Sequence, residues 1–77
     1  MREQIKQDIK KHAFDEAPNE CCGILLQNEE EKGLEIFKCK NSSANKAHHF
    51  LISPGDYLKA SEKGKILAFY HSHDSEE

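Results

Sequence analysis

Apolar residues in the first half of the chain follow first a helical spacing and then a strand spacing. Over residues 3–14 they recur every three to four positions, which predicts a helix with one apolar side. That side contains Ile5, Ile9, His12 or Ala13, and Phe14. Pro18 excludes continuation of the helix, and the short apolar run 21–26 predicts a strand buried on both faces. A polar turn at 28–33 and an alternating segment at 34–39 complete a predicted β-hairpin.

The second half of the chain predicts an extended segment, a helix and a further strand. Residues 48–52 are expected to be extended or to form a short strand. Ser53 suits a helix cap and Pro54 the first helical position, so a helix is predicted to begin here and to end at Gly64. The residues expected to face the core are Tyr57, Leu58 and Ala60. The apolar run 66–71 predicts a second strand of the buried type.

This order, α-β-β-(β)-α-β, predicts an α+β fold with a mixed sheet flanked by helices, in one domain spanning 1–77. The net charge of −3 and the scattered lysines argue against a nucleic-acid partner. No apolar run approaches the ~20 residues that cross a bilayer, which argues against a membrane partner. The first residues also lack the pattern of a signal peptide, so we expect a cytoplasmic protein.

The cysteines fit the same compartment. There are three, and two of them, Cys21 and Cys22, are adjacent, which suits a disulfide framework poorly. We therefore expect buried, reduced thiols. A thiol-based redox or metal-trafficking role is the alternative, but adjacent cysteines lack the Cys-x-x-Cys spacing of redox motifs.

The residues best suited to chemistry are two histidines at the end of the last predicted strand. His71 and His73 are two positions apart, so in a strand their imidazoles project from the same face and can hold Zn²⁺ together. His-x-His alone is a weak motif, since surface histidines without a role give the same spacing. Glu20 strengthens it, because this carboxylate stands at the start of the other apolar strand and suits a general base.

Three segments in this order resemble the JAMM/MPN (JAB-type) zinc metallopeptidase family, over nearly the whole chain. Residues 19–26 (NECCGILL) resemble the family's first motif, which contains its catalytic Glu. Asn41 followed by 49–57 (HFLISPGDY) resembles its middle stretch, and 64–73 (GKILAFYHSH) resembles the approach to its metal motif. The doubled cysteine and the short loops are most similar to the compact prokaryotic and phage-tail-assembly branch.

The resemblance implies a zinc-dependent enzyme that hydrolyses a peptide or isopeptide bond in a peptide or protein substrate. It implies that His71 and His73 are zinc ligands and that Glu20 is the general acid/base, which works through the zinc-bound water. Zinc is the cofactor implied, and the resemblance indicates no other cofactor-binding residues.

The sequence departs from the family pattern after His73. The family continues with Pro and then Ser-x-x-Asp, whose Asp is the third zinc ligand, whereas Asp74 replaces the Pro here and the sequence given reaches Glu77 first. We expect a C-terminally truncated, partial domain with little or no activity. The alternatives are a non-catalytic binding or assembly module, or an active chain in which a turn brings Asp74 to the metal as a substitute ligand. An absent segment would leave apolar surface on the last strand and favour self-association through an uncovered sheet edge.

Overall fold

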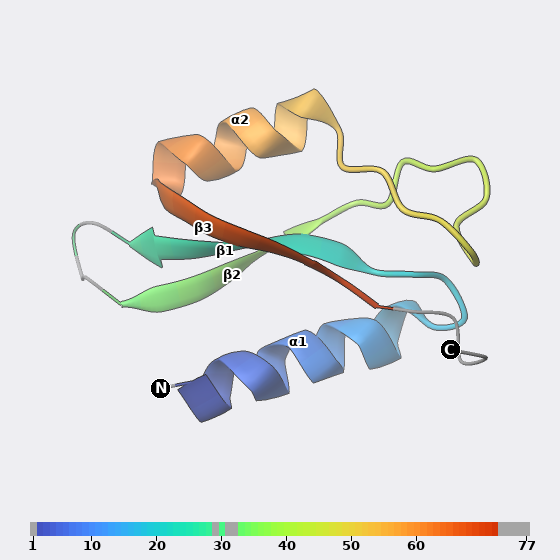
Figure 1. The fold of residues 1–77 in the computed structure, drawn as a ribbon, viewed down its shortest axis with the longest axis horizontal. Helices are drawn as coiled ribbons and strands as arrows, with labels where there is room; N and C mark the ends of the chain where they lie inside the picture. The colour runs from blue at the N-terminus through green and yellow to red at the C-terminus, as the bar shows by residue number, and fades with distance from the viewer. Residues whose placement is uncertain (1, 29, 31–32, 73–77) are drawn as a thin grey trace.

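The computed structural model describes residues 2–28, 30 and 33–72 and has two helices and three strands. The elements in chain order are α1 (Arg2–Glu16), β1 (Cys22–Asn28), β2 (Leu34–Cys39), α2 (Pro54–Lys63) and β3 (Gly64–His71). Figure 1 shows the sheet lying between the helices, with α1 on one face and α2 on the other. The predicted α+β class and the order of the main elements are confirmed.

The three strands form an antiparallel sheet in the order β2-β1-β3. β2 runs antiparallel to β1, and α2 delivers the start of β3 beside the end of β1, where Gly64 pairs with Asn28. Both connections reverse the chain direction, so within the described residues the prediction of a mixed sheet is wrong. Of the two alternatives for 48–52, an extended segment or a short strand, the strand does not form: the segment has a single bridge, between Asn41 and Ile52.

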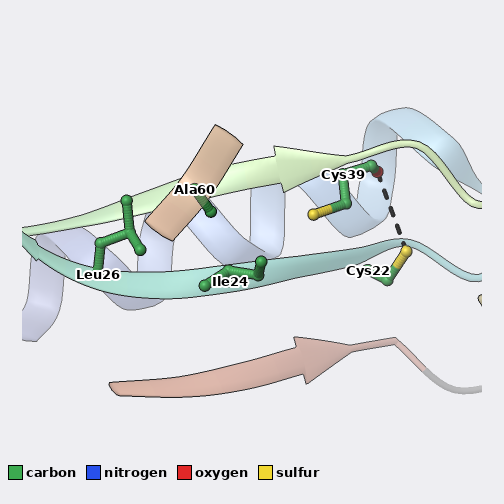
Figure 2. Close-up of a cluster of buried hydrophobic side chains, with 5 residues drawn as sticks. All are labelled: Cys22, Ile24, Leu26, Cys39 and Ala60. Atoms are coloured by element: carbon green, nitrogen blue, oxygen red, sulfur yellow. Dashed lines mark hydrogen bonds between the residues drawn. The ribbon is translucent and has the colours of Figure 1, made fainter. Parts of the chain in front are cut away.

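The hydrophobic core lies between β1 and α2. Figure 2 shows the buried cluster, which consists of Cys22, Ile24, Leu26, Cys39 and Ala60. The alternate residues of β1 in this cluster are 0% exposed, so the central strand supplies most of the core. Gly23 is buried too, and Leu25 is partly buried on the α1 side, which agrees with the predicted strand covered on both faces.

Each helix buries less of its apolar side than its sequence predicts. α2 begins as predicted, with the Ser53 hydroxyl accepting a hydrogen bond from the Asp56 amide at 3.2 Å. Ala60 is buried, but Tyr57 and Leu58 are 45% and 60% exposed, so their assignment to the core is wrong. In α1 the same holds for Phe14, which is 82% exposed. A sheet of three described strands offers each helix only a narrow surface. Only part of the apolar side of each helix can therefore be buried against it.

β3 is far more exposed than its apolar sequence predicts. It pairs with β1 on one side and lies at the edge of the described sheet. Leu67 and Phe69 are 44% and 54% exposed, which corrects the prediction of a buried strand. The physical reason is position, because an edge strand is covered by neighbours on one side only.

In the part of the chain that the structure describes, neither helix combines the length and the apolar character needed to span a bilayer.

Candidate active site

Glu20 and His71 meet where β1 begins and β3 ends. Glu20 lies two residues before β1, and the antiparallel register places Cys22 opposite His71. Oε1 of Glu20 is 4.0 Å from Nδ1 of His71. The carboxylate side chain is 9% exposed and the imidazole 35%, so a nearly buried acid faces a histidine that solvent can reach. The structure thus brings together two of the residues that the sequence predicts for the site.

Hydrogen bonds on both sides of the Glu20 backbone fix its position. Its amide donates to the carbonyl of Lys46 at 2.7 Å. Its own carbonyl accepts a hydrogen bond from Nδ2 of Asn41 at 2.8 Å. A carboxylate at the start of a strand would otherwise be free to turn to solvent, and these bonds hold the residue in the fold.

Two hydrogen bonds between Ser72 and Cys21 join the same two chain segments. The Cys21 amide donates to the Ser72 hydroxyl at 2.8 Å, and the Ser72 amide donates to the Cys21 carbonyl at 3.0 Å. Cys21 directly follows Glu20, and Ser72 directly follows His71. The bonds therefore extend the pairing of β1 and β3 past the last residue of β3 and keep the acid and the imidazole adjacent.

The His71 ring is oriented by two further contacts. Nδ1 lies 3.3 Å from the carbonyl oxygen of Ser72. The Phe50 ring stacks on the imidazole with a centroid distance of 4.3 Å and an interplanar angle of 18°. Metal-binding histidines commonly have one ring nitrogen bonded to a carbonyl, which fixes the tautomer and the ring orientation. The surroundings of His71 are thus of the kind that suits a metal ligand.

Sequence reasoning missed the structural parts played by Asn41, Ser72 and Phe50. The sequence presents Asn41 and Phe50 only as members of a motif, and Ser72 only as the residue between two histidines. The signal was present in Asn41, a polar residue placed directly after an apolar strand. Its side-chain bonds reach the chain 21 residues earlier, and no local pattern predicts such a pairing.

The described residues alone do not complete a zinc site. A catalytic zinc needs three protein ligands. No group of three His, Cys, Asp or Glu side chains suited to a metal occurs within residues 2–28, 30 and 33–72. His73 and Asp74, the predicted second ligand and its substitute, lie outside the described residues. What the structure supplies is one imidazole with a carboxylate beside it.

A second polar pair, formed by the buried His12 and the partly buried Tyr70, lies on the α1 side of the sheet. Nδ1 of His12 shares a hydrogen bond with the Tyr70 hydroxyl at 2.7 Å, and His12 is 3% exposed. Burial lowers the pKa of His12, although Glu16 opposes the shift. The Tyr70 ring lies against the backbone of Gly23, where a Cβ atom would overlap it. The pair joins α1 to β3 one residue before His71.

The cysteines are buried and free, as predicted. Burial raises the pKa of Cys22 to about 11 and that of Cys39 to about 12. Their thiolates are therefore scarce at neutral pH, and a thiolate is the form that reacts or binds metal. These two side chains belong to the core and not to the candidate active site.

Two comparisons place the chain among known proteins. The model of a family described as prokaryotic homologs of the JAB domain matches residues 2–77. The chain is also 40% identical over 73 residues to the Tail tip assembly protein K of Escherichia phage N15, and this match covers 95% of the chain and 29% of that protein. No solved structure gives a significant match. The resemblance found in the sequence is confirmed, and the chain belongs to the family of prokaryotic homologs of the JAB domain.

Proposed function

We propose that this chain carries the acid/base and part of the metal site of a zinc-dependent peptidase or isopeptidase. The observation that carries the proposal is the nearly buried Glu20 carboxylate held 4.0 Å from His71. Burying a carboxylate is costly unless it is paired or hydrogen-bonded, and His71 is a titratable group that the structure places beside it. Membership of the JAB family supports the choice of zinc and of peptide hydrolysis.

In this proposal each residue of the site has a distinct task. His71 and His73 would hold the zinc, and a zinc ion bound there would supply an activated water and polarise the scissile carbonyl. Glu20 takes a proton from the attacking water and returns it to the leaving amine. Its backbone is held at both the amide and the carbonyl, which fixes the position from which the carboxylate reaches the space beside His71.

The zinc site needs a third ligand from outside residues 2–72. We propose that residues 1–77 form part of a domain and that residues after His73 supply this ligand, with Asp74 as the candidate nearest in sequence. The match to the phage relative covers only 29% of that protein, so the activity of the whole relative says little by itself about this chain. The reading frame after Glu77 tests this proposal about the third ligand. The expected result is a Ser-x-x-Asp within about a dozen residues.

Peptide hydrolysis by the protein encoded in the complete reading frame tests the function. A peptide library with zinc should show new amine termini for the wild type, and none after addition of a chelator. Glu20→Gln should abolish cleavage, since the amide cannot accept and return the proton. Cleavage that persists in Glu20→Gln, or a wild type that cleaves nothing with zinc bound, would overturn the proposal.

The second candidate is a non-catalytic module for assembly, including self-association through the edge of β3. The name of the phage relative, a tail tip assembly protein, and the exposed Leu67 and Phe69 on this edge favour it. Placing Lys at both positions should then abolish association while the protein stays folded. Light scattering that gives the same mass for the wild type and this variant would exclude self-association through β3.

A further inference from the structure

We propose that Asn41 is the positioning residue of the candidate active site, because one side chain holds both the Glu20 backbone and the loop at 42–51 against His71. Its consequence for catalysis rests on the proposed function, whereas the positioning itself does not. Asn41 follows β2 and is 8% exposed, so it lies inside the fold and not on its surface. A buried polar side chain is stable only when its hydrogen bonds are made.

The contacts of Asn41 use both ends of its amide. Nδ2 donates to the carbonyl oxygens of Glu20 at 2.8 Å and His49 at 2.9 Å. Oδ1 accepts from the amides of Leu51 at 3.1 Å and Ser43 at 3.0 Å. Only a side chain with two N–H donors and a carbonyl acceptor satisfies this set, so an acid of the same size cannot replace it.

The loop at 42–51 delivers an aromatic ring to the site. Phe50 lies between His49 and Leu51, and Asn41 binds the backbones of both of these neighbours. Its ring is the one that stacks on His71 at 4.3 Å. The same loop contains Lys46, whose carbonyl accepts the Glu20 amide. Release of Asn41 would therefore loosen the acid and uncover the imidazole in one event.

The variant Asn41→Asp tests whether the hydrogen bonds of Asn41, and not only the volume of its side chain, position the site. It keeps the size of the side chain, removes both donors and places negative oxygen against two carbonyls. The matched control is Asn45→Asp, which adds the same charge to an exposed position in the same loop. Ring-current shifts in the NMR signals of Phe50 and His71 report the stack directly, and a general loss of stability does not move them while the protein is folded.

The ring-current shifts of Phe50 and His71 should disappear in Asn41→Asp. In Asn45→Asp they should equal the wild-type shifts within the error of the measurement. Amides in the middle of β1 should remain protected from exchange in both variants, which shows that the sheet is intact. Unchanged Phe50 and His71 shifts in a folded Asn41→Asp protein would overturn the proposal.

Hydrogen exchange of the wild type provides a test that needs no variant to fold. The amides of Glu20 and Leu51 are 31 positions apart, but the loop and Asn41 connect them. They should exchange as one unit, with similar protection factors. A Leu51 amide that exchanges at the rate of an unprotected loop while the Glu20 amide stays protected would contradict the proposal.

Activity then shows whether the positioning matters for catalysis. Misplacement of a catalytic group by about 1 Å can lower the rate ~100-fold, so kcat should fall by about that factor in Asn41→Asp and stay unchanged in Asn45→Asp. Failure of the proposed function would appear as an inactive wild type with intact stacking shifts. Failure of this inference would appear as an Asn41→Asp variant with the kcat of the wild type, or as unchanged shifts.

Discussion

The middle of β1 and the segment that leads into it are held by different forces. In the middle, Ile24 and Leu26 are fully buried among apolar side chains (Figure 2). At the beginning, Glu20 is nearly as buried but is held by hydrogen bonds to Asn41 and to the backbone of Lys46. Burial of apolar surface is strong and non-directional, whereas hydrogen bonds are weaker and fix direction. The middle of the strand stabilises the fold, and its beginning orients the site.

The largest expected effect comes from the apolar middle. Ile24→Ala removes a side chain that is 0% exposed and leaves a cavity, so the free energy of unfolding should fall by about 2–5 kcal/mol. Leu58→Ala, on the 60% exposed Leu58, is the control and should change it by less than ~0.5 kcal/mol. Urea denaturation measures both values. Equal effects of the two variants would show that the core is placed wrongly.

A smaller effect is expected at Gly23, where strand and aromatic ring meet. Gly23→Ala places a methyl group where the Tyr70 ring lies, and overpacking of this kind costs about 1–3 kcal/mol. In a Tyr70→Leu background the same change should cost clearly less, because the ring is gone. A double-mutant cycle with no coupling energy would contradict the contact between Gly23 and Tyr70.

Loss of a hydrogen bond at the beginning of β1 should lower the stability only slightly but should change the geometry of the candidate active site. Ser72→Ala removes the acceptor of the Cys21 amide and should cost about 1 kcal/mol of unfolding free energy. The nuclear Overhauser contacts between Glu20 and His71 should weaken nonetheless. Ser61→Ala, at an exposed serine of α2, is the control for both measurements. A Ser72→Ala variant that loses stability but keeps these contacts would show that Ser72 does not position Glu20 and His71.

The smallest effect is a dependence on pH from the pair on the α1 side. Burial lowers the pKa of His12 below its ordinary value of 6.5, so the folded protein holds this ring neutral while the unfolded chain takes up a proton. Stability from His12 is therefore present above pH 6.5 and is lost as pH falls towards the pKa in the folded state. His12→Gln should show a shallower loss of unfolding free energy between pH 7.5 and 5.5. The same slope in both proteins would contradict the lowered pKa.

The elements that the sequence predicts well are those set by local chemistry. The cap at Ser53 and the end of the second helix near Gly64 depend on residues a few positions apart. The proximity of Glu20 and His71 also follows from local signals, because each residue directly adjoins an apolar run. Their contact at 4.0 Å follows once those two runs are adjacent strands.

What could not be predicted depends on long-range packing. Exposure of Phe14 and Phe69 follows from the narrow sheet and from the position of β3 at its edge, and neither is written in a local pattern. The bonds of Asn41 to Glu20 need the exact register of distant segments. The apolar character of a residue therefore does not by itself predict its burial in this fold.

Zinc titration by calorimetry tests the central claim most directly, namely that His71 binds the metal and Glu20 acts beside it. The protein of the complete reading frame should bind one zinc per chain. His71→Ala should abolish this binding, whereas Glu20→Gln should retain it, since the carboxylate is assigned to proton transfer and not to coordination. Zinc binding that survives in His71→Ala, or that disappears in Glu20→Gln, would contradict the assignment of roles.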